Sequence, residues 1–157
     1  MRKKKSIPFA EHLLKLYRSG LSREVQQVSV QKEDDDMPSI EMRVQHVLDI
    51  VKRKHDKSRM LFFVMYDIEN DKVRRQVVKY LLRKGCMRIQ KSIFIADVEH
   101  KVFSEIKDSL MEVQECYEND DSILVVPIST DYLQAMKIIG KNIDIDIILK
   151  NKSTIFI

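Results

Sequence analysis

The stretch Met60-Leu61-Phe62-Phe63-Val64-Met65-Tyr66-Asp67 decides the fold of this 157-residue chain. Its apolar run, residues 60–66, ends at a carboxylate and predicts a central β-strand buried on both faces. The run is far too short to span a bilayer, and no apolar segment of a signal peptide follows the basic N-terminus. Two cysteines without metal-type spacing indicate free thiols in a reducing compartment. We therefore expect a cytoplasmic protein.

The residues after Asp67 alternate between helix and strand signals. Asn70 or Asp71 is expected to cap a helix that runs to Lys84 and is closed by Gly85. Strand, helix and strand signals then follow over residues 87–95, 99–116 and 123–128, the first as one kinked strand or two short ones. This order predicts an α+β fold, the ferredoxin-like βαββαβ sandwich.

Both ends of the chain add to this unit. The strict alternation over residues 143–147 predicts an extra C-terminal strand, which must pair with an edge of its own sheet or of a neighbour's. The composition changes near residue 60, so we divide the chain into a helical N-terminal extension, 1–59, and a ferredoxin-like domain, 60–157. In the extension, Asp36 and Pro38 predict the start of a helix with a heptad-like apolar seam. So short a seam favours docking on a partner or on the domain.

Positive charge is concentrated in the expected helix after Asp67 and the strand that follows. Residues 72–91 carry eight basic residues and no acidic one, whereas residues 92–157 carry 6 basic and 12 acidic residues. A basic block in an acidic domain favours a phosphate-backbone partner, and the alternative is a solvated helix face. The candidate nucleic-acid-binding residues are Arg74, Arg75, Lys79, Arg83, Arg88 and Lys91.

Asp67 is the candidate catalytic and metal-binding residue. A lone carboxylate at a strand end beside a basic helix can hold Mg²⁺, which prefers oxygen ligands and keeps several waters. Glu69, Asn70 and Asp71 either add ligands or cap the helix, and a capped, solvated turn is the alternative for the whole segment. One chain offers few ligands, so a homodimer that brings two copies of Asp67 together would complete such a site. The chain has no glycine-rich phosphate loop and no paired-cysteine zinc motif.

Four blocks of the chain, in order and with consistent spacing, resemble the CRISPR-associated Cas-two (Cas2) family. They are residues 63–68, 71–81, 85–94 and 123–140, which lie in about half of the chain. The most specific is Arg88-Ile89-Gln90-x-Ser92-x-Phe94. The resemblance implies a ferredoxin-like core that forms a homodimer, with C-terminal strands crossing to the partner's sheet.

The resemblance also implies a role. Family dimers bridge the Cas-one (Cas1) integrase and lie along the double-stranded protospacer DNA during spacer acquisition. They are also described as Mg²⁺-dependent endonucleases that hydrolyse phosphodiester bonds, which makes Asp67 the metal ligand here. The positions that the resemblance associates with the active or DNA-facing surface are Arg74, Arg88, Ser92 and Phe94. Of these, Ser92 and Phe94 have a supporting role, together with Tyr66. Gln76 departs from a position that is often basic in relatives.

The extension is the larger departure, because relatives begin near Met60. Residues 1–59 are either an additional arm that docks a partner or binds DNA, or the result of a misassigned start codon. The alternative function is a toxin-type, VapD-like endoribonuclease, which shares the fold. A neighbouring integrase gene would favour the adaptor, and an adjacent antitoxin gene would favour the toxin.

Overall fold

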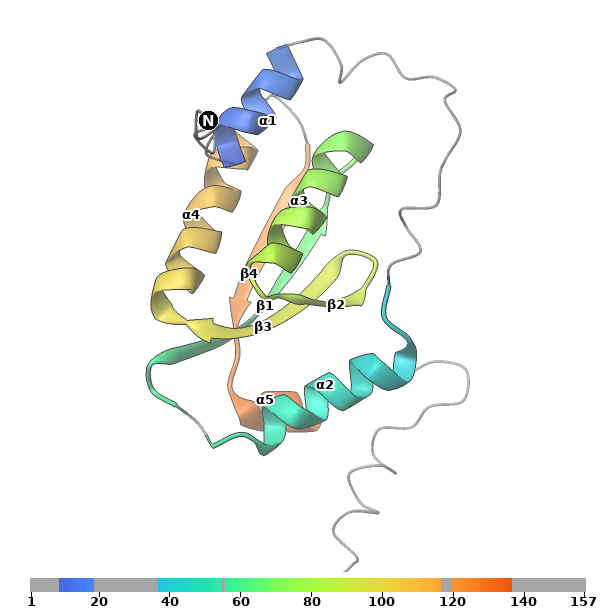
Figure 1. The fold of residues 1–157 in the computed structure, drawn as a ribbon, viewed down its shortest axis with the longest axis vertical. Coiled ribbons are helices and arrows are strands. Elements are labelled where there is room, and N and C mark those ends of the chain that lie inside the picture. The colour runs from blue at the N-terminus through green and yellow to red at the C-terminus, as the bar shows by residue number, and fades with distance from the viewer. Residues whose placement is uncertain (1–8, 19–36, 55, 117–119, 137–157) are drawn as a thin grey trace, which may run out of the picture.

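A computed structural model of the chain describes residues 9–18, 37–54, 56–116 and 120–136. Figure 1 shows the helices and strands of these residues, with two helices ahead of the first strand. The elements are α1 (Phe9–Arg18), α2 (Ile40–Lys52), β1 (Arg59–Asp67), α3 (Asp71–Arg83), β2 (Met87–Gln90), β3 (Ile93–Glu99), α4 (His100–Glu115), β4 (Ser122–Pro127) and α5 (Thr130–Ala135). In the described residues, no helix has the length and apolar character needed to cross a membrane.

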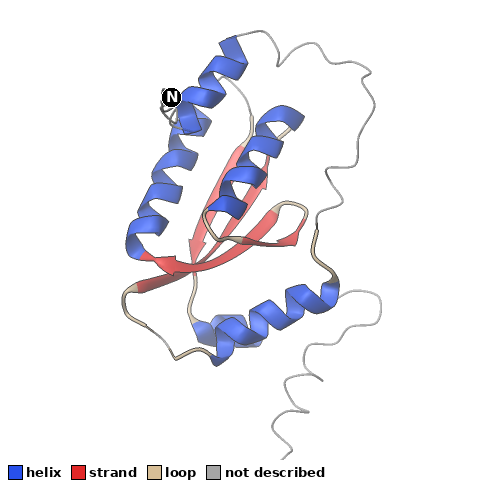
Figure 2. Ribbon diagram, in the orientation of Figure 1, coloured by secondary structure: helices blue, strands red, loops and turns tan. Residues whose placement is uncertain are grey.

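The strands form one sheet in the order β2-β3-β1-β4, and every neighbouring pair is antiparallel. This order is that of the ferredoxin-like βαββαβ sandwich, which confirms the predicted fold class. The 87–95 segment forms two short strands joined by a turn at residues 91–92 (Figure 2). The expected strand over residues 143–147 lies outside the described residues.

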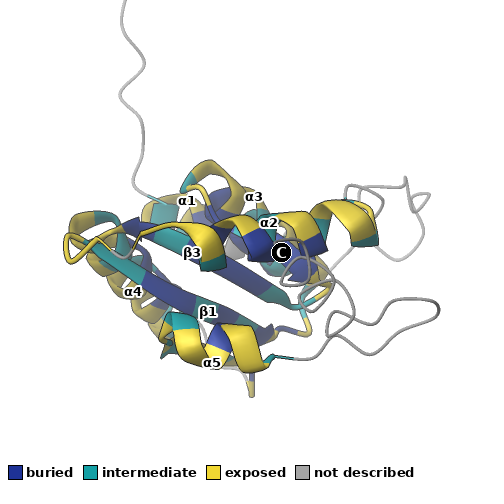
Figure 3. Cartoon of the chain, turned by 90° about the horizontal axis from the view of Figure 1, so that it is seen from below, coloured by how far each residue is buried: buried dark blue, intermediate teal, exposed yellow. Residues whose placement is uncertain are grey.

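Alternate side chains of β1 lie on opposite faces of the sheet. Phe62 and Val64 belong to a core shared with α3 and α4, whereas Leu61 belongs to a second core shared with α2 and α5. Figure 3 shows α2 and α5 on the second face, with their buried residues toward the sheet. The apolar run therefore is a strand buried on both faces, as its sequence predicts.

Helix α3 begins and ends where its sequence predicts. The Asn70 side-chain oxygen accepts hydrogen bonds from the backbone N–H groups of Lys72 and Val73, at 3.0 and 3.1 Å. Gly85 follows the Lys84 cap with a φ of +86°, a conformation that favours glycine. These two ends fix the bounds of the helix, which begins shortly after Asp67 in the chain.

Helix α2 begins at a different residue from the predicted one. Ser39 is the N-cap, and its hydroxyl oxygen accepts a hydrogen bond from the Met42 backbone N–H at 3.3 Å. The hydroxyl satisfies a free donor of the first turn, so neither Asp36 nor Pro38 starts the helix. The seam docks on the domain, since Val44 and Val47 are buried.

Polar contacts hold α2 against the sheet. The Arg43 guanidinium donates a 2.8 Å hydrogen bond to the Ile89 carbonyl of β2. At the other end of α2, Asp97 of β3 lies 3.6 Å from Arg53 and 3.1 Å from Arg59. Helix α1 packs on the opposite face, against α3 and α4. Both described helices of residues 1–59 thus pack on the domain that follows them.

Two substitutions on α4 test the position of the core. We expect Ile106→Ala, at a fully buried position, to lower the free energy of unfolding by about 2–5 kcal/mol because it leaves a cavity. Met111→Ala, at a position 56% exposed on the same helix, should change it by less than about 0.5 kcal/mol. Urea unfolding followed by circular dichroism measures both, and equal losses would contradict this packing.

Candidate nucleic-acid and metal site

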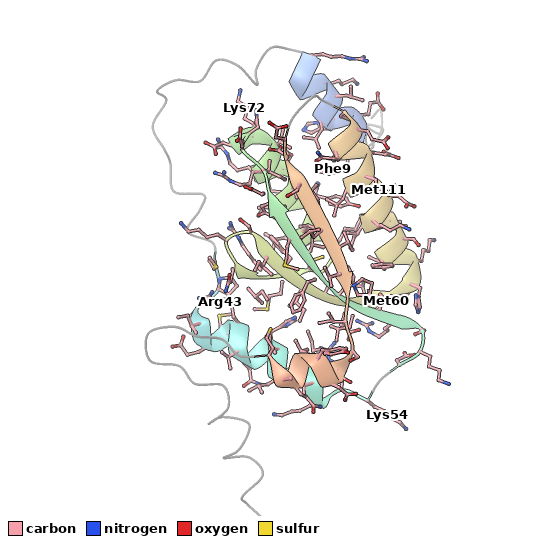
Figure 4. The ribbon with its side chains drawn as sticks, turned by 180° about the vertical axis from the view of Figure 1, so that it is seen from behind. Phe9, Arg43, Lys54, Met60, Lys72 and Met111 are labelled. Carbon is pink, nitrogen blue, oxygen red and sulfur yellow. The ribbon has the colours of Figure 1, made fainter. Side chains whose placement is uncertain are left out.

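Asp67 ends β1 at the edge of the molecule where α3 begins. Its side chain is exposed, and in the strand register it lies opposite Ser122 of β4. Figure 4 shows Lys72 at this end of the fold and Met60, at the start of β1, toward the opposite end. The buried strand therefore carries one carboxylate out of the core into solvent.

The loop between β1 and α3 is fixed by Asp121, which is not among the predicted site residues. Asp121 is only 9% exposed, and its carboxylate accepts a 3.0 Å hydrogen bond from the Glu69 backbone N–H. Its carbonyl accepts a 2.7 Å hydrogen bond from the Gln114 side chain of α4. The sequence feature that could have pointed to Asp121 is the pair of carboxylates, Asp120 and Asp121, just before a predicted strand. Asp121 holds the loop rather than facing a ligand.

The block Arg88–Phe94 braces the end of β1. The Lys91 carbonyl accepts hydrogen bonds from Arg88 Nε and Nη2, at 3.0 and 2.6 Å, and from the Tyr66 hydroxyl at 3.1 Å. The Ser92 carbonyl accepts from the Tyr66 backbone N–H at 3.0 Å. Phe94 is fully buried, with its ring centroid 6.2 Å from that of Tyr66, so its ring supports the strand end from the core and does not lie on a DNA-facing surface. These residues position the strand end that presents Asp67.

Arg88 therefore differs from the other basic candidates. It is 4% exposed, and its guanidinium is turned inward to the Lys91 carbonyl. A buried cation is stable only when such hydrogen bonds compensate for its lost hydration. This bond gives Arg88 a structural role, and its predicted contact with nucleic acid stays a prediction.

The exposed basic side chains lie on α3. Arg75, Lys79 and Arg83 are all exposed and are spaced four residues apart on the helix. Arg74 is half-buried instead, and its guanidinium pairs with the Asp71 carboxylate at the start of α3. Lys91 is exposed on the β2–β3 turn. The structure thus brings three of the predicted residues together in one row, called the α3 row below.

A divalent cation would need more ligands than one chain provides here. Within the described residues, no group of three or more histidine, cysteine, aspartate or glutamate side chains could hold a metal ion. The Asp71 carboxylate is paired with Arg74, and the Asp121 carboxylate accepts a hydrogen bond from the Glu69 backbone N–H. Fewer than three such side chains gather around Asp67, so these residues fit a Mg²⁺ site only if a second copy contributes ligands.

Cys86 does not supply a nucleophile. Burial raises the pKa of its thiol to about 12, so the thiol stays protonated at neutral pH. Both cysteines are free, as the sequence predicts.

Residues 60–136 match the family model of CRISPR associated protein Cas2. Over this segment the chain resembles the Cas2 family. The Cas2-like segment runs from β1 to the end of α5 and includes Asp67, the α3 row and the Arg88–Phe94 block. The match confirms the resemblance stated from the sequence blocks and supports a CRISPR-associated role. No curated protein sequence matches the chain.

The brace at Lys91 yields a test of what Arg88 does. We expect Arg88→Met to lower the free energy of unfolding by about 2–3 kcal/mol, because it removes the charged, buried donor of two hydrogen bonds to the Lys91 carbonyl. Tyr66→Phe, which removes one neutral hydrogen bond, should cost about 1 kcal/mol. Chemical denaturation measures both. A stable Arg88→Met protein that has lost affinity for nucleic acid would instead assign Arg88 to the binding surface.

Proposed function

We propose that this Cas2-like protein is a CRISPR adaptation protein whose homodimer binds duplex DNA along α3 and bridges a Cas1 integrase during spacer acquisition. The observation that carries the proposal is the α3 row, exposed on a helix whose other side is buried in the core. The family match supplies the CRISPR-associated context.

The α3 row suits a sugar–phosphate backbone. Eight residues of helix separate Arg75 from Arg83, a distance of about 12 Å at ~1.5 Å per residue. One DNA strand presents a phosphate about every 3.4 Å along the helix axis, so the row spans roughly three to four phosphates. Contacts of this kind carry no base information, and we infer binding that is sequence-tolerant and sensitive to salt.

The charges on α4 indicate on which side of the molecule a DNA duplex would bind. Its exposed residues include four carboxylates: Glu105, Asp108, Glu112 and Glu115. Like-charge repulsion would hold a phosphate backbone away from this helix, while α3 attracts it. The duplex would therefore lie on the outer side of α3.

The sheet edge supports the proposed dimer. In the described part of the chain β4 has a neighbour on one side only, β1. An edge strand exposes backbone donors and acceptors that can pair with another strand. The strand expected over residues 143–147 would supply one, from the same chain or from a second copy. We infer a homodimer that presents two α3 rows to one duplex.

Two substitutions in the α3 row test DNA binding. Arg75→Ala with Lys79→Ala should reduce the slope of log affinity against log salt by about 1.8, and affinity by roughly tenfold or more at physiological salt, for every duplex sequence. Fluorescence anisotropy across a salt series measures both quantities.

The matched control is Lys101→Ala with Lys107→Ala, which removes two exposed charges from α4. We expect this pair to leave the slope nearly unchanged. Equal effects of the two double variants would reject the α3 row as the binding surface.

A second candidate function is a Mg²⁺-dependent nuclease, favoured by the exposure of Asp67 at the end of a buried strand. Mg²⁺ would act there as a Lewis acid toward a phosphodiester. Two Asp67 carboxylates, one from each copy, would hold the ion, and the basic side chains of α3 would orient the backbone.

Asp67→Asn tests this activity. We expect it to lower Mg²⁺-dependent cleavage of RNA or DNA by roughly 100-fold while leaving duplex affinity nearly unchanged, since it removes charge at the metal but not from the α3 row. Asp131→Asn, at an exposed position on α5, is the matched control. Cleavage at the full rate in Asp67→Asn, or in excess chelator, would disprove the nuclease assignment and leave the adaptor role standing.

A further inference from the structure

The connection between α2 and β1 carries a dense group of basic side chains. Residues 52–59 include five lysine or arginine residues and one acidic residue, Asp56. Four of the five are exposed and are called the basic patch below: Lys52, Arg53, Lys54 and Lys57. Arg53 lies 3.6 Å from Asp97, but among the described residues none of the three lysines pairs with a carboxylate. Three lysine charges therefore remain available to a partner.

Hydrogen bonds hold this segment against the first residue of α4. The His100 backbone N–H donates to the Ser58 carbonyl at 3.1 Å, and the His100 Nε2 atom lies 3.1 Å from the Lys57 carbonyl oxygen. The Asp56 carboxylate accepts a 2.9 Å hydrogen bond from the Ser58 backbone N–H. The backbone that carries Lys57 is thus fixed before a partner binds, which lowers the entropic cost of binding.

The basic patch lies beyond the C-terminal end of α3. At that end, the Lys84 ammonium donates a 2.7 Å hydrogen bond to the Glu105 carboxylate of α4. Glu105 is five residues after His100, so the start of α4 lies about 7.5 Å past this contact, at ~1.5 Å per residue. Figure 4 shows Lys72, in the first turn of α3, at one end of the fold and Lys54 at the other. The α3 row therefore runs toward the basic patch.

The carboxylates near the patch leave it positively charged. The pKa of Glu105 is lowered, mainly by its hydrogen bond from Lys84 and also by the charge of Lys101. The Lys101 charge is thus offset by Glu105, and Lys101 is not part of the basic patch. Asp56 and Glu99 adjoin the patch as exposed carboxylates, and its four cations outnumber them.

The composition of the patch favours a duplex phosphate backbone over other polyanions. The large apolar side chains exposed in the described residues are Met42, Leu82, Met111, Leu124 and Tyr132, and none belongs to residues 52–59. Protein interfaces are centred on apolar or aromatic anchors, and single-stranded nucleic acids are bound by aromatic stacking. Lysines without either suit duplex phosphates, which they contact as point charges.

We propose that the basic patch binds the phosphate backbone of the duplex that lies on the α3 row, past the C-terminal end of α3. The row and the gap to α4 add up to about 20 Å, or roughly six base pairs at 3.4 Å each. This inference rests on the proposed function and adds a second binding element to it. It gives the N-terminal extension a role, because α2, docked on the sheet, carries three of the four cations to the domain.

Removal of two lysines in the full-length chain tests the proposal. We expect Lys54→Ala with Lys57→Ala to reduce the slope of log affinity against log salt by about 0.9 to 1.8, which corresponds to one or two lost phosphate contacts. Fluorescence anisotropy with a duplex of about 20 base pairs, longer than the combined surface, measures the slope. The matched control is Lys15→Ala with Lys107→Ala, exposed lysines of α1 and α4, which should leave the slope nearly unchanged. Equal effects of the two pairs would overturn the proposal.

A photo-crosslink tests the shared duplex without removing a charge. Ser58 is exposed next to Lys57, and a benzophenone side chain in its place keeps all four cations. We expect it to crosslink to the labelled duplex, with a lower yield when Arg75→Ala and Lys79→Ala are added, because one duplex contacts both surfaces. A yield that does not respond to these two changes would place the patch on a separate duplex and overturn the proposal.

The remaining outcomes separate this inference from the proposed function. An unchanged slope in the patch variant, with a reduced slope in Arg75→Ala plus Lys79→Ala, would overturn the inference and leave DNA binding by α3 intact. No change in either variant would overturn both. Binding of poly-glutamate that the patch variant abolishes, with duplex affinity unchanged, would assign the patch to an acidic protein and also overturn the inference. A reduced slope in both variants, larger when they are combined, would support one continuous binding surface.

Discussion

Burial of β1 on both faces is the constraint on which the rest of the structure depends. Phe62 and Val64 lie in the core under α3 and α4, and Leu61 lies in the core under α2 and α5. Each such side chain stabilises the fold by about 1.5–3 kcal/mol through loss of exposed apolar surface. The strand must therefore stay between two helical layers. Its last residue, Asp67, is carried to the surface where α3 begins.

Much of this arrangement could be predicted from the sequence, because it depends on interactions between residues that are close together in the chain. The apolar run that forms β1, the Asn70 cap and the glycine after α3 each depend on residues within a few positions of one another. The strand order could be predicted as well, since the βαββαβ order admits few topologies. The α3 row could also be expected, because residues spaced four apart on a helix lie on the same face.

Contacts between distant segments could not be predicted in this way. Stacking of Phe9 on Tyr80 joins residues far apart in the chain, and neither residue marks it in the sequence. The basic block of the sequence includes Arg88 but does not show that its guanidinium is turned inward to the Lys91 carbonyl. Asp121 likewise gains its role only when β4 pairs with β1. Tertiary packing, not residue type, separates the basic residues that face solvent from those that hold the fold.

The proposed duplex lies on α3 and away from α4, and site-specific photo-crosslinking tests that placement most directly. Leu82 on α3 and Met111 on α4 are both exposed apolar residues, at 45% and 56%, so a benzophenone side chain can replace either without removing a charge. With labelled duplex DNA, we expect crosslinks from position 82 and almost none from position 111. Crosslinks mainly from position 111, or from neither position while the protein is bound, would contradict it.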